Sequence, residues 1–119
     1  GAIPVAEIAL NTSDKYLAIL ISALLGNAYK FTQEGTISLE CDRLGDDRVF
    51  VAVADTGCGI PPEKHGYVFE RFTKLDPFSQ GNGLGLYLCR LIVTHLHGEI
   101  YIDSGYTGGT RIVAILPRR

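Results

Sequence analysis

Residues 49–61 read VFVAVADTGCGIP, and this stretch decides the fold. Its first six residues are apolar, so both faces of the strand are apolar, as is typical of a strand at the centre of a sheet. The strand ends at Asp55, and Gly57 and Gly59 follow it. Glycine permits positive φ and a close approach of the backbone to a ligand. The stretch therefore predicts a lone carboxylate at the end of a central strand, beside a glycine turn.

The segments around this strand predict the rest of a sandwich. Strands are expected at residues 3–10, 36–43, 49–54, 99–104 and 110–116, and helices at residues 14–31 and 85–97. The helices should bury Leu17, Leu20, Ile21, Leu24, Leu25 and Ala28 in the first, and Leu88, Cys89, Ile92 and Leu96 in the second. Residues 61–80, with three prolines and mixed charges, have the character of a mobile flap. The order predicts a two-layer α+β sandwich, with helices on one face of a sheet.

Composition limits the function classes. The chain has 119 residues, enough for one compact domain, and a net charge of −2 from 11 basic and 13 acidic residues. No basic stripe occurs, so neither nucleic acid nor a membrane surface is expected as the partner. No apolar run approaches the roughly 18 residues of a membrane span. Three widely spaced cysteines without a C-x-x-C pair indicate reduced thiols and a cytoplasmic setting.

Two further polar motifs flank the central carboxylate. Residues 24–32 read LLGNAYKFT and place Asn27 and Lys30 one turn apart on an apolar helix. The Asn27 amide oxygen can help hold a hard cation, and Lys30 can reach a phosphate as a point charge. Residues 81–86 read GNGLGL and open the second helix, whose free N–H groups favour phosphate. This spacing fits neither a dinucleotide fingerprint nor a Walker loop.

Asp55 suits recognition of a base. A carboxylate accepts a hydrogen bond from an exocyclic amine, which adenine has where guanine carries a carbonyl. Ile60 and Leu86 could sandwich the purine ring, or could simply belong to the core. The three motifs together predict a site for a Mg-nucleotide.

At these motifs the chain resembles the catalytic ATP-binding domain of sensor histidine kinases, in the group that includes DNA gyrase, MutL and the heat-shock chaperone ATPases. Residues 24–32 resemble the N box, residues 55–61 the G1 box, residues 69–72 (FERF) the F box and residues 81–86 the G2 box. The likeness runs from about Asp14 to Pro117. It implies a mixed sheet of about five strands, with an ATP lid at about residues 61–81.

The resemblance also implies roles for individual residues. Asn27 would be the Mg ligand, Asp55 would bind adenine, and Thr110 matches the position that supports this aspartate. Arg71 and Lys74, in the lid, would meet the β- and γ-phosphates. The expected catalytic residues are Asn27, Lys30, Arg71 and Lys74. The expected ATP-binding residues are Asn27, Lys30, Asp55, Gly57, Gly59, Ile60, Gly81, Gly83, Leu84, Gly85, Leu86 and Thr110.

The departures from the family are also informative. Gyrase-like ATPases carry a water-activating glutamate four residues before Asn27, and histidine kinases commonly carry asparagine; here the residue is Ala23. We therefore expect poor hydrolysis. His65, His95 and His97 do not stand in the setting of a phosphoacceptor, so the acceptor helices would precede residue 1. The chain would be a fragment, residues 1–119 forming its single catalytic domain, that donates the γ-phosphate to a histidine on a separate dimerisation domain. By itself it should lack autophosphorylation, and a response regulator receiver domain would be the downstream partner.

Two other functions fit parts of the sequence. Asp55-Thr56-Gly57 also spells the D-T-G of small dimeric aspartic proteases, but that class needs an almost all-β chain and leaves the other motifs unused. A degenerate nucleotide-binding module without kinase activity is the alternative that Ala23 favours.

Overall fold

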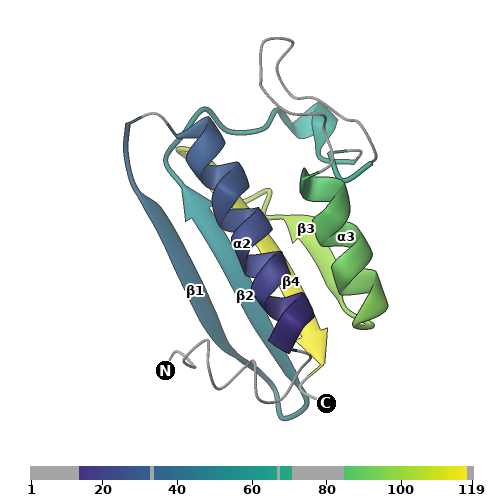
Figure 1. The fold of residues 1–119 in the computed structure, drawn as a ribbon. Coiled ribbons are helices and arrows are strands. Elements are labelled where there is room, and N and C mark those ends of the chain that lie inside the picture. Colours follow the sequence, from purple (N-terminus) through teal and green to yellow (C-terminus); the bar gives the residue numbers. More distant parts are fainter. Residues whose placement is uncertain (1–13, 33, 67, 71–84, 118–119) are drawn as a thin grey trace.

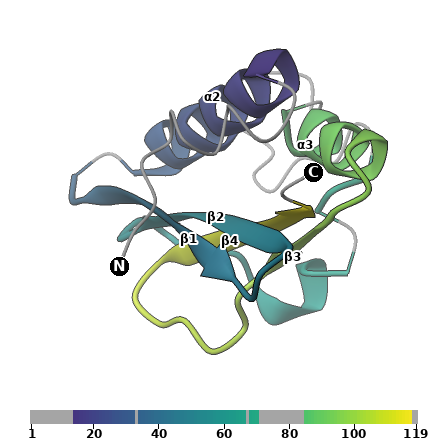
Figure 2. The same cartoon turned by 90° about the horizontal axis from the view of Figure 1, so that it is seen from below.

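The protein is a two-layer α+β sandwich in the computed structural model, which describes residues 14–32, 34–66, 68–70 and 85–117. Helices α2 (Asp14–Phe31) and α3 (Gly85–His95) lie side by side on one face of a four-stranded sheet (Figures 1 and 2). The predicted fold class is confirmed. Neither helix of this described part is long and apolar enough to cross a bilayer.

The sheet has the strand order β1-β2-β4-β3. Its strands are β1 (Ile37–Leu44), β2 (Arg48–Asp55), β3 (Glu99–Ile102) and β4 (Thr110–Pro117). The predicted central place of β2 is confirmed, because it pairs with both β1 and β4. All described pairs are antiparallel, whereas a mixed sheet of about five strands was expected. The strand expected at residues 3–10 lies outside the described residues.

The core lies between the helices and one face of the sheet. The predicted stripe of α2 is buried at Leu17, Leu20, Leu24 and Ala28, with Leu25 packed against its edge. Across from it, Val49, Val51 and Val53 of β2 and Ile112, Ala114 and Leu116 of β4 face the helices. Because strand side chains alternate between faces, the residues between them point to the opposite side of the sheet. We call that side the outer face.

Helix α3 corrects one prediction. Cys89 is fully buried and Ile92 nearly so, as expected, but Leu88 is 41% exposed. Leu86 and Val93 complete the buried stripe instead. The stripe centres on Cys89, and Leu88 lies about 100° around the helix from it. Apolar character alone had placed Leu88 inside.

The flap predicted from residue 61 onward is described only at its start. A short 3₁₀ turn, η1 (Pro62–Lys64), follows the glycine turn. Val68 and Phe69 are then buried in the core cluster. Phe69 therefore joins the start of this segment to the core of the sandwich.

Candidate functional site

The described parts of the three polar motifs gather at one end of the sandwich. Helix α2 and strand β2 end here, and helix α3 and strand β4 begin here (Figure 1). Asn27 and Lys30 belong to the last turns of α2, Asp55 ends β2, Gly85 opens α3 and Thr110 opens β4. The fold thus brings together segments that are far apart in the sequence.

Asp55 is a buried carboxylate held by backbone donors. Its side chain belongs to a residue that is only 4% exposed. Oδ1 accepts hydrogen bonds from the N–H groups of Gly57, at 2.9 Å, and Thr110, at 3.3 Å. Since both bonds go to Oδ1, the carboxylate is fixed in orientation, and Oδ2 is the oxygen that can serve a ligand. Thr110 contacts this carboxylate through its backbone N–H, and the role that the resemblance implies for this residue stays a prediction.

Two glycines let the loop before β4 approach the end of β2. Gly109 has φ +153°, and a Cβ there would overlap the carbonyl oxygen of Asp55. Gly59 has φ +77°, and its Cβ would lie 3.3 Å from the carbonyl oxygen of Gly109. The positive φ expected at Gly59 is confirmed. Gly57, by contrast, has no positive φ and contributes an N–H donor.

The glycine turn after Asp55 is braced on both sides. His65 Nε2 lies 2.8 Å from the carbonyl oxygen of Ile60, and because a carbonyl oxygen can only accept, the ring N–H donates this hydrogen bond. Thr56 is tied to Thr36 twice: its N–H donates to the Thr36 carbonyl at 3.1 Å, and its Oγ1 accepts the Thr36 N–H at 2.9 Å. The contact with Ile60 gives His65 a structural role in this turn.

The polar residues of α2 are accessible. Asn27 is half-buried and Lys30 is exposed, whereas Ala23 packs partly against the core. No group of three or more His, Cys, Asp or Glu side chains that could hold a metal ion occurs among the described residues. Asn27 as a magnesium ligand stays a prediction.

The remaining predicted residues divide into two groups. Arg71, Lys74, Gly81, Gly83 and Leu84 lie outside the described residues. Gly85 is exposed at the start of α3, Leu86 is a 7% exposed member of the core, and Ile60 is half-buried against that core. For Leu86 the core interpretation therefore holds, while Ile60 keeps an accessible side.

Sequence reasoning missed two residues that contact Asp55. Gly109 makes the close approach described above, and the Tyr106 hydroxyl donates a hydrogen bond to the Asp55 carbonyl oxygen at 3.3 Å. The Gly108-Gly109 pair before Thr110 was a usable signal for the first. No local pattern points to Tyr106, because 51 positions separate it from Asp55.

Comparison with known proteins supports the resemblance. The family described as "Histidine kinase-, DNA gyrase B-, and HSP90-like ATPase" matches residues 12–119. Hybrid signal transduction histidine kinase K of Dictyostelium discoideum is 38% identical over 93% of this chain and 10% of its own length. The adaptive-response sensory kinase SasA of Gloeothece citriformis is 41% identical over 82% of this chain and 26% of its own length. The chain thus spans a tenth to a quarter of these relatives.

Solved structures agree. The mycobacterial sensor histidine kinase MprB superposes with a TM-score of 0.79 at 27% identity, covering 88% of this chain and 72% of that one. Full-length ShkA in complex with AMPPNP gives a TM-score of 0.77 at 29% identity, covering 86% of this chain and 21% of that one. The fold is that of histidine kinase catalytic domains.

Proposed function

Because the chain belongs to the family of histidine kinase-, DNA gyrase B- and HSP90-like ATPases, we propose that it binds Mg-ATP and donates the γ-phosphate to a histidine on a separate dimerisation domain. It would act within a two-component sensor kinase, in the cytoplasmic part of the parent protein. The phosphorylated histidine would in turn serve a response regulator receiver domain. The names of the two relatives described above, a hybrid signal transduction histidine kinase and an adaptive-response sensory kinase, support this setting.

The observation that carries the proposal is the orientation of the Asp55 carboxylate. Gly57 and Thr110 hold Oδ1 through their N–H groups, so Oδ2 is directed by backbone geometry rather than by a free rotamer. A buried, fixed acceptor suits the exocyclic amine of adenine. Guanine would present its carbonyl oxygen to the carboxylate, which leaves two acceptors facing each other without a proton. The site should therefore select adenine.

The phosphate end of the proposed site rests on α2. The accessible Asn27 offers an uncharged amide oxygen, and Lys30 adds a positive charge in the next turn. When bound, ATP would supply the transferable phosphoryl group, and its Mg²⁺ ion would neutralise part of the charge on the phosphates. The chain's own contribution is to bind and align, which is most of what catalysis of phosphoryl transfer requires. Arg71 and Lys74 remain our prediction for the contacts to the β- and γ-phosphates.

Ala23 supports both the proposal and its alternative. Its methyl group cannot accept a proton, so this position cannot activate water as the gyrase-like glutamate does. A γ-phosphate would therefore survive for transfer to another acceptor. The same residue also removes one possible support for the metal, which favours the second candidate, a nucleotide-binding interaction module without kinase activity.

Two measurements test the proposal. Calorimetric titration of the chain with ATP, ADP and GTP in the presence of Mg²⁺ should show micromolar-range binding of the adenine nucleotides and weaker binding of GTP. Joining the chain to the phosphoacceptor helices of its parent and incubating with γ-labelled ATP should label a histidine. ATP binding without labelling would select the interaction module, and absence of ATP binding would reject both candidates.

A further inference from the structure

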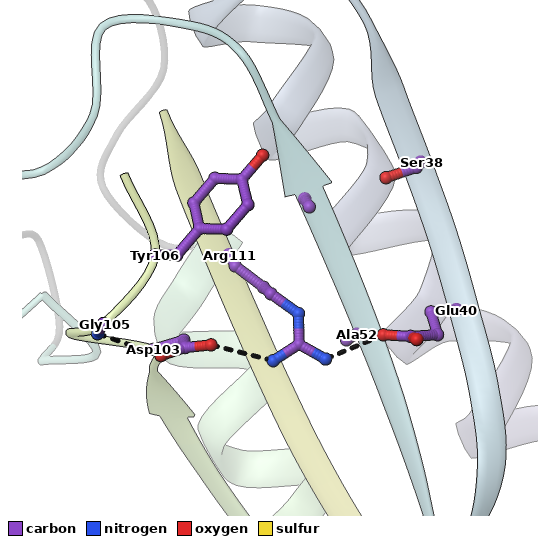
Figure 3. A pocket seen from close by; sticks show the side chains of 8 residues that line it. Ser38, Glu40, Ala52, Asp103, Gly105, Tyr106 and Arg111 are labelled. Atoms are coloured by element: carbon purple, nitrogen blue, oxygen red, sulfur yellow. Dashed lines mark hydrogen bonds and ion pairs between the residues drawn. The ribbon is translucent and has the colours of Figure 1, made fainter. Parts of the chain in front are cut away.

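A hollow of about 640 Å³ lies on the outer face of the sheet, away from both helices (Figure 3). Glu40 of β1 and Arg111 of β4 line it, together with Asp103 and Tyr106 of the loop that joins β3 to β4. Glu40 precedes the core residue Cys41, and Arg111 precedes the core residue Ile112, so both side chains point to the outer face. The proposed nucleotide site uses none of these side chains.

Arg111 connects the edge strand to the loop after β3. Its Nη2 donates to Glu40 Oε1 at 2.7 Å, and its Nη1 donates to Asp103 Oδ2 at 2.9 Å (Figure 3). The small side chain of Ala52, paired with Glu40 and also lining the hollow, leaves room for this crossing. The Arg111 side chain is 24% exposed. The hydrogen bond to Glu40 raises the pKa of the Arg111 guanidinium above its ordinary value. The guanidinium is thus a permanent, partly shielded bridge.

Asp103 connects Arg111 to the loop between β3 and β4. Its Oδ1 accepts the Gly105 N–H at 3.0 Å, and its carbonyl accepts the Tyr106 N–H at 3.2 Å. Its own N–H donates to the Arg111 carbonyl at 2.8 Å. Because both the side chain and the backbone of Asp103 form hydrogen bonds, Asp103 fixes the position of the Tyr106 backbone, from which the aromatic ring extends.

Tyr106 ends the chain of contacts at the base-recognising residue. Its hydroxyl donates to the carbonyl oxygen of Asp55 at 3.3 Å. The Asp55 side chain is held from the other direction by Gly57 and Thr110. The carbonyl and the carboxylate of Asp55 are therefore held by separate donors. The carbonyl belongs to the peptide group that leads into Thr56 and Gly57, so a rotation of this group would move the Gly57 N–H that holds Oδ1.

We propose that Tyr106, held in place by the Asp103–Arg111 ion pair, is a positioning residue that sets the direction of the Asp55 carboxylate from the outer face. This inference rests on the proposed recognition of adenine by Asp55. It adds a determinant of base selectivity that touches neither the base nor the phosphates. Tyr106, Asp103 and Arg111 all line the hollow.

The test replaces Tyr106→Phe, which removes only the hydroxyl, and uses Tyr101→Phe as the matched control. Tyr101 lies on the same face, between the core-facing residues Ile100 and Ile102, and is 43% exposed. Loss of one hydrogen bond should weaken ATP binding about 2- to 12-fold. GTP binding should be unchanged, so the ATP-to-GTP ratio should fall by the same factor. Displacement of a fluorescent ATP analogue measures both nucleotides in the 119-residue chain.

A second readout needs no nucleotide. The amide resonances of Gly57 and Thr110 report on the Oδ1 atom to which they donate, so they should shift in Tyr106→Phe and stay in place in Tyr101→Phe. Arg111→Met, which keeps the aliphatic stem without the charge, should shift the same two resonances. The double variant should lower the ATP-to-GTP ratio no more than Tyr106→Phe alone, because the two residues act in series.

The outcomes separate the two levels of the argument. If the unmodified chain selects ATP but Tyr106→Phe has the same ratio and the same amide resonances, the positioning role is wrong and the proposed function stands. If ATP and GTP binding weaken equally, Tyr106 has only a general structural role. If the unmodified chain binds no ATP, or does not distinguish it from GTP, recognition by Asp55 fails and this inference fails with it.

Discussion

The substitution Asp55→Asn should separate base recognition from folding. The asparagine retains one oxygen, which can still accept the Gly57 and Thr110 N–H groups at 2.9 and 3.3 Å. Its second group is an NH₂ donor, which would face the amine of adenine donor to donor. Loss of a hydrogen bond to a charged acceptor costs about 1.5–3 kcal/mol, which corresponds to a Kd for ATP about 10- to 150-fold higher. GTP should gain affinity, since its carbonyl oxygen would meet a donor.

Titration calorimetry with ATP and GTP measures this change, and thermal unfolding without nucleotide measures stability. Because both backbone bonds persist, the free energy of unfolding should fall by about 1 kcal/mol or less. Asp55→Ala is the contrast, since it leaves the buried N–H of Thr110 and the partly buried N–H of Gly57 without an acceptor and should cost about 1–3 kcal/mol of stability as well as the affinity. Asp47→Asn, in the exposed turn between β1 and β2, is the matched control. An unchanged ATP-to-GTP ratio in a folded Asp55→Asn variant would refute the reasoning.

Three further predictions concern the metal, the thiols and the core. Asn27→Asp adds a negative charge beside the phosphates, so calorimetry should show ATP binding that depends more steeply on Mg²⁺; equal loss with and without Mg²⁺ would contradict the assigned role. In the native chain only the exposed Cys58 should be alkylated at pH 9, and ATP should slow its reaction; burial raises the pKa of Cys89 to about 12 and keeps that thiol protonated. Mass spectrometry counts the modified sites, and early labelling of Cys89 would show that its environment is open. Leu24→Ala, at a side chain 1% exposed, should cost about 2–5 kcal/mol in urea unfolding, against about 0.5 kcal/mol for the exposed Leu88→Ala; similar losses would argue against the described core.

Much of the fold could be predicted because its signals are local. The spacing of Leu17, Leu20 and Leu24 marks one side of a helix at about 3.6 residues per turn, and that side is buried in the structure. The strand before Asp55 is apolar on both faces, which placed it correctly at the centre of the sheet. The prediction failed at Leu88, since its exposure depends on where the sheet lies beneath α3.

The candidate site was predicted in its parts. Asp55 was singled out as a carboxylate at the end of a strand, and β2 does end there. Asn27 lies in the last turns of α2, and Thr110, which the resemblance pointed to, opens β4. Positive φ occurs at Gly59, as expected, and also at Gly109, which was not predicted. Which glycine adopts it is set by the contact of two loops that are some 50 residues apart, as the overlap of a Gly109 Cβ with the Asp55 carbonyl shows.

The amino-acid sequence by itself determined the helices, the central strand and the residue types that mark a nucleotide site. These follow from interactions within a few positions, such as hydrophobic periodicity and the conformational freedom of glycine. Only the tertiary structure decided how the Asp55 carboxylate is aimed. The carboxylate is held by the N–H groups of Gly57 and Thr110, and Thr110 is 55 positions away. The Asp55 carbonyl accepts a hydrogen bond from Tyr106, 51 positions away, and Arg111 bridges to Glu40 across 71 positions. Contacts at such separations form only when the sheet assembles, so no local pattern records them.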